Sequence, residues 1–125
     1  MYVLDSSILI DVLRKTERFK QLRKAFGTIP LITTSISAHE LVVGARTDKQ
    51  RFVLEHLLTG MRILPHDSGA AKQSGQIERE LIHAGKSINT PDALIAGICR
   101  MHGAELITAD TDFMRVHDLK VHLIK

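Results

Sequence analysis

The chain has 125 residues, of which 44% are hydrophobic, and this length suits a single globular domain over residues 1–125. Its net charge of +3 only mildly favours a polyanionic partner, and no apolar run approaches the ~20 residues of a transmembrane helix. The single cysteine excludes a disulfide framework and a cysteine-based zinc site, and we expect cytoplasmic residence.

The N-terminal segment predicts a short buried strand over residues 2–5 and a helix over 8–14. Asp5 ends the strand, where an unpaired buried charge would be costly. Its carboxylate either caps the helix by accepting backbone N–H groups or belongs to a functional site. Asp11, four residues before Lys15, is explained by an exposed ion pair.

A basic stretch follows, in which an amphipathic helix over 17–26 is closed by Gly27. Six cations opposed only by Glu17 cluster here: Arg14, Lys15, Arg18, Lys20, Arg23 and Lys24. The cluster is either the solvated face of a helix or a surface that contacts phosphates, and the two interpretations are compatible.

A second strand is predicted over 31–33 and a third helix over 38–46. Ser37 and Glu40 have the spacing of a capping box, in which the glutamate only bonds the backbone at the helix start. This helix also begins just beyond a strand end, where sites form in parallel sheets. Local sequence leaves both roles of Glu40 open.

The central segment predicts a helix over 48–59, a strand over 61–64 and a long helix over 70–83. Asp67 is most simply the N-cap of the long helix, and Gly85 fits the position just past its end.

A helix start with an acid in its first turn is predicted near residue 90. Thr90 is a suitable N-cap, Pro91 fits the first helical position and Asp92 falls in the first turn. Gly103 fits the residue past the helix end.

A buried strand over 105–108 comes next, followed by two acids. Asp110 lies two residues beyond the strand, and we assign it to a metal site. Asp112 precedes a short helical turn, so we expect it mainly to cap that turn. Thr108 should orient one of the carboxylates through its hydroxyl. The chain closes on an alternating strand over 119–123.

The alternation of strands and helices predicts an α/β fold with three layers, α/β/α, around a central, mostly parallel sheet. The ends of parallel strands meet at one edge, where the pattern places four acids: Asp5, Glu40, Asp92 and Asp110. Such carboxylates repel and would take up protons unless a cation intervened. Oxygen-only ligands select Mg²⁺ or Mn²⁺, which serve phosphate chemistry.

Four segments, in this order and spacing, resemble the PIN-domain ribonucleases, in particular VapC-type toxins of toxin–antitoxin pairs. They are VLDSSILID, the helix with Glu40-Leu41, TPDALIAG, and GAELITADTDF, and the resemblance covers the whole chain. Ser6 stands where threonine is common in the family, which keeps the hydroxyl that helps position the site. Asp112 could compete with Asp110 for the role of fourth acid.

The resemblance implies a Mg²⁺- or Mn²⁺-dependent endoribonuclease whose catalytic and metal-binding quartet maps to Asp5, Glu40, Asp92 and Asp110. Ser6, Thr108 and Asp112 would then support the site or position substrate. It also implies an RNA substrate, a homodimer, and a small VapB-like antitoxin whose tail occupies the groove.

Other proteins of this fold class fit the residues less well. A phosphoaspartate receiver domain needs an acid after its third strand, where this chain has Pro65, and a lysine after its fifth. A haloacid-dehalogenase-type phosphatase needs a second aspartate two residues after Asp5, where Ser7 stands. A non-toxin RNA-processing nuclease and a non-catalytic PIN-like binding module stay open, although the module would be expected to lose some of its acids.

Overall fold

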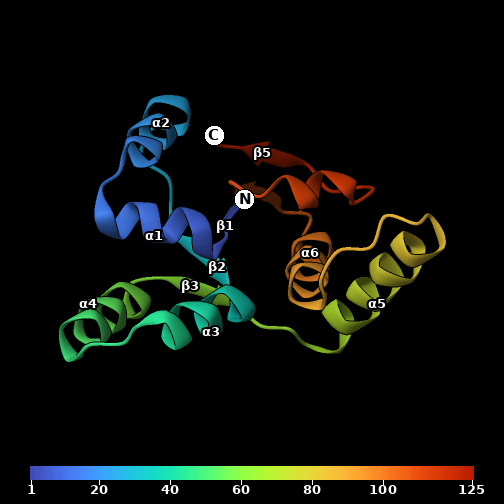
Figure 1. Cartoon of the computed structure of the whole chain (residues 1–125), viewed down its shortest axis with the longest axis horizontal. Helices are drawn as coiled ribbons and strands as arrows, with labels where there is room; N and C mark the ends of the chain where they lie inside the picture. The colour runs from blue at the N-terminus through green and yellow to red at the C-terminus, as the bar shows by residue number, and fades with distance from the viewer.

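The computed structural model describes all 125 residues and has five short strands, each parallel to its partners (Figure 1). The strands are β1 Tyr2–Leu4, β2 Ile32–Thr34, β3 Arg62–Leu64, β4 Glu105–Thr108 and β5 Val121–Leu123. Backbone hydrogen bonds pair β1 with β4 and β4 with β5 in one ladder of three strands, and they pair β2 with β3 in a second ladder of two strands. The parallel pairing that the alternation of elements predicts is confirmed.

The two ladders meet where β1 and β2 lie side by side without forming a ladder of their own. Instead, the Thr33 hydroxyl of β2 donates a hydrogen bond of 2.6 Å to the carbonyl oxygen of Leu4 in β1. Thr33 is fully buried, so this bond is shielded from water. The strands therefore follow the order β3–β2–β1–β4–β5, with a seam between β2 and β1.

Helices cover both faces of this sheet, and Figure 1 shows α1 to α4 on one side of the molecule and α5 and α6 on the other. Their bounds are α1 Ser6–Arg14, α2 Glu17–Phe26, α3 Ser35–Gly44, α4 Asp48–Thr59, α5 Ser68–His83 and α6 Thr90–His102. A short 3₁₀ turn, η1, spans Thr111–Arg115. None of the helices combines the length and the hydropathy that crossing a membrane requires.

The hydrophobic core has separate parts on the two faces of the sheet because neighbouring strand residues point to opposite sides. Leu4 and Ile107 pack with residues of α1 to α4, whereas Val3 and Leu106 pack with residues of α6. The predicted three-layer α/β/α architecture is thus confirmed.

The start of α3 differs from the prediction because a different residue caps it. The Thr34 hydroxyl accepts the backbone N–H of Ser37 at 3.1 Å, so the helix begins at Ser35 rather than at Ala38. Ser37 therefore lies inside the helix and cannot form the predicted capping box with Glu40.

The N-cap of α6 is Asn89 and not Thr90. The Asn89 side chain accepts the backbone N–H of Asp92 at 2.9 Å, whereas the Thr90 hydroxyl donates to Glu78 of α5 at 2.7 Å. The helix ends at Gly103 in a left-handed conformation, with φ of 60°, as its sequence predicts.

Asp11 is buried, so the prediction of an exposed ion pair with Lys15 is wrong. Lys15 ends α1 in the left-handed region, with φ of 51°, and is therefore off the helical face. The Asp11 carboxylate instead accepts the Thr16 hydroxyl at 2.8 Å and lies 3.2 Å from Nε of Arg18. One of the six cations of the basic stretch thus joins α1 to α2.

Candidate metal-binding site

Asp5 lies directly after β1 and is the N-cap of α1. One carboxylate oxygen, Oδ1, accepts the Ser7 hydroxyl and backbone N–H, and Oδ2 accepts the Thr108 hydroxyl from the end of β4. Burial raises the pKa of Asp5 above its ordinary value, although these hydrogen bonds oppose the shift. Asp5 therefore caps a helix and also lies near the other acids, and its functional role stays a prediction.

Ser7 is a site residue that the sequence reasoning missed. Its hydroxyl donates to Asp5 and accepts the backbone N–H of Ala109 at 3.3 Å, so it joins the ends of β1 and β4. The spacing of Asp5 and Ser7 was the available signal, since an aspartate N-cap often bonds the residue two positions on.

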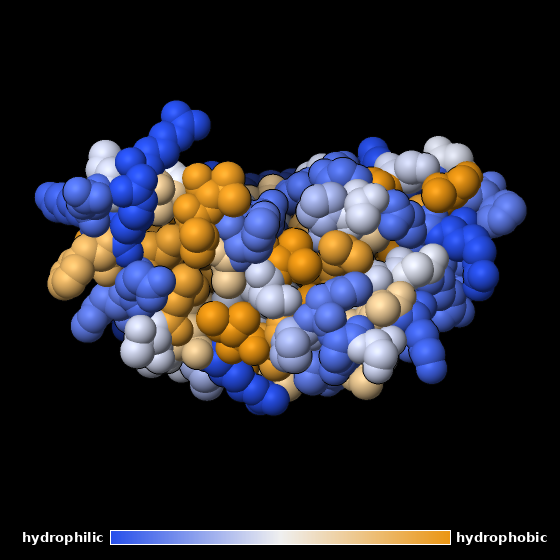
Figure 2. All heavy atoms as spheres, turned by 90° about the horizontal axis from the view of Figure 1, so that it is seen from below, coloured by the Kyte–Doolittle hydropathy of each residue, from blue (hydrophilic) through white to orange (hydrophobic).

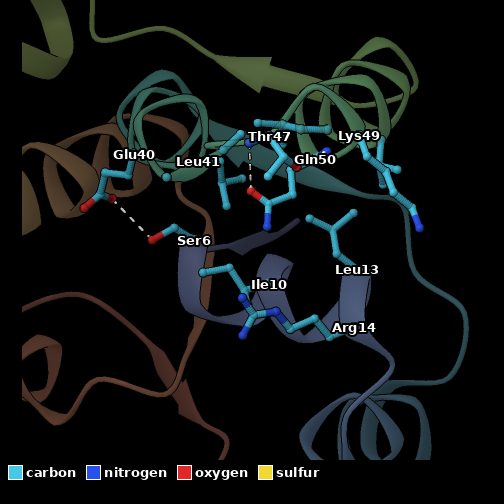
Figure 3. Close-up of a pocket in the computed structure, with 13 residues that line it drawn as sticks. Ser6, Ile10, Leu13, Arg14, Glu40, Leu41, Thr47, Lys49 and Gln50 are labelled. Carbon is cyan, nitrogen blue, oxygen red and sulfur yellow. Dashed lines mark hydrogen bonds between the residues drawn. The ribbon is translucent and has the colours of Figure 1, made fainter.

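Glu40 lies on α3, with its side chain toward the start of α1. Its Oε1 accepts the Ser6 hydroxyl at 3.3 Å (Figure 3). Burial raises the pKa of Glu40, with the Asp5 charge adding to the shift and the Ser6 hydrogen bond opposing it. The structure therefore excludes the capping-box role and places Glu40 beside the other acids.

Asp92 is the buried centre of the acids, in the first turn of α6. Only 8% of the residue is exposed, and its Oδ2 has no hydrogen-bond partner. Burial raises its pKa to about 6, and the charges of Asp110, Glu40, Asp5 and Asp112, in decreasing order, add to that shift. An unpartnered carboxylate oxygen among like charges is costly unless a cation or a proton compensates it.

Asp110, and not Asp112, caps the short turn η1. Asp110 is the N-cap of η1, since its Oδ1 accepts the backbone N–H of Asp112 at 2.9 Å. Asp112 instead lies inside the turn, 3.6 Å from Nη2 of Arg115. The prediction that Asp112 is the capping residue is therefore wrong, although Asp110 keeps its predicted place at the site.

Three of these carboxylates are close enough to share one ion. Asp92, Asp110 and Asp112 each offer an oxygen, and these oxygens lie within 4.8 Å of one another. We call these residues the aspartate trio, and the trio with Asp5 and Glu40 the acid group. The trio includes Asp112 in place of Asp5 and Glu40, which the predicted quartet contains.

A hard divalent cation fits this arrangement. The ligands are all carboxylate oxygens, as Mg²⁺ and Mn²⁺ prefer, and the bare Asp92 oxygen supplies an uncompensated charge for the ion. Thr108 positions two of the acids. Its hydroxyl accepts the Asp110 backbone N–H at 3.0 Å and donates to the Asp5 carboxylate. The predicted positioning role of Thr108 agrees with this geometry.

An apolar groove of about 570 Å³ opens beside the acid group, between α1, α3 and α4 (Figure 3). Ser6 and Glu40 lie at the groove, Ile10, Leu13 and Leu41 line it, and the cationic residues Arg14 and Lys49 also border it. The groove therefore continues from the acid group along a largely apolar surface.

The outer surface of α3 and α4 is also apolar. Val42, Val43, Phe52 and Val53 are between 43% and 76% exposed, and we call them the apolar face. Figure 2 shows apolar side chains gathered on the side of the molecule where these helices lie. Phe52 is thus a surface residue. Exposed apolar patches of this kind mark protein interaction sites.

Comparisons with known proteins agree with the fold. The PIN domain family matches residues 2–119. The tRNA(fMet)-specific endonuclease VapC of Shigella flexneri is 27% identical over 124 residues, which are 95% of this chain and 94% of that protein. A protein of the same name from Salmonella typhimurium is 25% identical over 125 residues, 96% of this chain and 95% of that protein.

Solved structures show the same relationship. The DNA-bound VapBC complex of Salmonella typhimurium matches with a TM-score of 0.86 and 25% identity, covering 99% of this chain and 98% of that chain. FitAcB of Neisseria gonorrhoeae matches with a TM-score of 0.81 and 27% identity, covering 97% of this chain and 96% of that chain. The chain therefore belongs to the PIN domain family, and its resemblance to the VapC-type members of that family is confirmed.

Proposed function

We propose that this chain is a Mg²⁺- or Mn²⁺-dependent endoribonuclease and the toxin of a VapBC-type pair, formed by a single PIN domain over residues 1–125. The observation that carries the proposal is the aspartate trio, in which the buried Asp92 also has an unpartnered carboxylate oxygen, Oδ2. The similarity to curated VapC endonucleases supports the same activity.

The trio would hold the ion, with Asp5 and Glu40 completing the negative surroundings. Once bound, such an ion lowers the pKa of a water molecule and neutralises charge on a phosphate. Glu40 is the most exposed of the acids, and its raised pKa suits a carboxylate that accepts a proton from the attacking water. Asp5 is held rigidly by Ser7 and Thr108, which keeps its charge directed at the site.

A VapB-like antitoxin is the proposed protein partner. The similar structures include toxin–antitoxin complexes from several bacteria, and the apolar groove of this chain begins at Ser6 and Glu40. An antitoxin segment in this groove would pack against Ile10 and Leu41 and reach the acid group, which would block access of RNA. The apolar face then offers a surface for a second copy of the chain, the predicted homodimer.

A non-toxin processing nuclease would use the same acids, whereas a non-catalytic module would not need them. All five members of the acid group are present, and the pKa of Asp92 is raised by its burial and, in addition, by the charges of the other four. Perturbed carboxylates gathered in one place favour catalysis over passive binding.

The test is cleavage of single-stranded and looped RNA by the purified chain in Mg²⁺ or Mn²⁺, with EDTA as the chelated control. We expect slow endonucleolytic cleavage that EDTA abolishes and that Asp92→Asn removes. Asp118→Asn is the matched control, because Asp118 is an exposed aspartate at φ of 56°, where asparagine is tolerated. Cleavage that persists in EDTA, or in purified Asp92→Asn, would contradict the proposal.

A further inference from the structure

We propose that a basic hollow beside the acid group binds a backbone phosphate of single-stranded RNA, next to the phosphate that is cut. The proposal rests on the proposed nuclease function and adds a contact for its substrate. The hollow is lined by Gly85, Lys86, Ser87, Met114 and Arg115, from the loop before α6 and the end of η1.

Arg115 connects the hollow directly to the acid group. Its Nη1 donates to the Ser87 carbonyl oxygen at 2.9 Å, and its Nη2 lies 3.6 Å from the Asp112 carboxylate. The guanidinium is therefore fixed between the loop and the trio, and 46% of its side chain stays exposed. An exposed cation therefore lies directly beside the trio, where it is available to a phosphate that neighbours one bound at the trio.

Other donors at the hollow are free to bind an anion. Lys86 takes part in no ion pair of the structure. The backbone N–H and hydroxyl of Ser87 donate no hydrogen bond within the chain, and Ser87 is exposed. An ammonium, a guanidinium, an amide and a hydroxyl are the donors that proteins direct at nucleic-acid phosphates.

The lining favours RNA over a protein segment. Only Met114 is hydrophobic among the five lining residues, whereas the apolar groove beside Glu40 has six hydrophobic residues for a peptide to bury. An RNA strand carries further phosphates on both sides of the cleaved one, so it can place one charge at the trio and the next at Lys86. The basic hollow would thus bind RNA, and the apolar groove would bind a protein segment.

The experiment measures binding, which does not depend on cleavage. A fluorescein-labelled single-stranded RNA is titrated with the full chain carrying Asp92→Asn, in Mg²⁺, over a series of salt concentrations. Lys86→Gln is compared with Lys72→Gln in the same background. Lys72 is an exposed lysine on α5, and the 11 positions from Lys72 to His83, where the helix ends, place it about 16 Å along the helix from the loop of the hollow.

Lys86→Gln should weaken binding roughly fivefold, equally for two unrelated RNA sequences, and lower the slope of log K against log salt by about 0.7. Lys72→Gln should leave the affinity and the slope unchanged. If the salt slope of Lys86→Gln equals that of Lys72→Gln, the proposal is overturned. The same result is expected if Lys86 binds a carboxylate of a partner protein and not RNA. Since wild-type cleavage is measured separately, loss of this phosphate contact and failure of the nuclease function are distinguishable.

Discussion

The hydroxyl of Thr108 donates a hydrogen bond to Oδ2 of Asp5, which joins two residues 103 positions apart in the sequence. The same hydroxyl accepts the backbone N–H of Asp110, so one buried side chain positions two members of the acid group. A threonine at the end of β4 thus fixes where the carboxylates of two different strand ends lie.

Replacing Thr108 by valine should damage both the site and the fold. The change keeps the shape of the side chain but leaves a buried carboxylate oxygen and a backbone N–H with one partner fewer, at about 1–3 kcal/mol of unfolding free energy for each unsatisfied group. Since this hydrogen bond lowers the pKa of Asp5, that pKa should rise in the variant. We expect cleavage to fall about 10–100-fold, the scale for partners of metal ligands. Thr108→Ser restores the hydroxyl, so cleavage and melting temperature should recover; a valine variant as active as wild type would contradict this role.

The metal-free protein should be less stable at neutral pH than at mildly acidic pH because of Asp92. Its pKa is about 6 in the folded chain against an ordinary 3.8, so the folded state holds the proton more tightly. The stability that this adds is complete below about pH 4 and is lost as the pH rises through 6. In EDTA, Asp92→Asn should therefore melt above wild type at pH 7.5, and the difference should shrink toward pH 4.5.

Added Mn²⁺ provides the control for this comparison. An ion that binds only the folded state raises the melting temperature of wild type. Asp92→Asn should respond much less, which would reverse the order of the two proteins at pH 7.5. If the two proteins melt together at every pH in EDTA, the acids are not repelling one another as inferred.

Paired variants distinguish the capping and metal-binding roles of Asp110 and Asp112. Asp110→Asn keeps an N-cap of similar quality and removes only a charge, whereas Asp110→Ala also removes the cap, at about 1 kcal/mol. Both Asp110 variants should lower Mn²⁺ affinity, measured by calorimetry, and only the alanine variant should melt lower. Asp112→Asn should also weaken Mn²⁺ binding, because Asp112 belongs to the trio. Unchanged Mn²⁺ affinity in Asp112→Asn would return Asp112 to a purely structural role.

The contact of α5 with α6 gives a test of packing that is independent of the site. A Cβ added at Gly97 would lie 2.5 Å from the Cβ of Ser74 and 2.6 Å from its backbone nitrogen. Gly97→Ala must push the two helices apart, at about 1–3 kcal/mol of unfolding free energy. Gly75→Ala is the control on α5, since nothing lies within 4 Å of its added Cβ, and it should stabilise by up to about 1 kcal/mol. Urea unfolding of both variants measures the difference.

Sequence predicted the elements well where local signals decide them. The helices Glu17–Phe26 and Asp48–Thr59 and the strand Glu105–Thr108 have the predicted bounds, because amphipathic periodicity and capping residues act within a few positions. The residue that caps a helix was harder to predict where two suitable residues are neighbours. Asn89 and Thr90 can both cap a helix, and contact of Thr90 with Glu78 of α5 is not visible in sequence.

The site was predicted in outline, since parallel strand ends bring their acids to one edge. Which carboxylates lie close enough together to share an ion depends on side-chain directions that sequence does not give, and the trio accordingly includes Asp112. The burial of Asp11 has the same cause, because Arg18 reaches it from a different helix. Spacing rules describe neighbours along one helix, whereas these contacts arise when separate elements pack.

The seam between β2 and β1 divides the acid group unequally. Glu40 follows β2, while Asp5 and the trio follow strands of the other ladder or the helix packed on it. Side-chain hydrogen bonds cross this boundary, from Thr33 to Leu4 and from Ser6 to Glu40, where a ladder would otherwise fix the register. Between β1 and β2, side-chain hydrogen bonds and core packing therefore hold the sheet together where backbone pairing does not. Amide hydrogen exchange should accordingly be faster along the edges of β1 and β2 that face each other than along β1 where it meets β4.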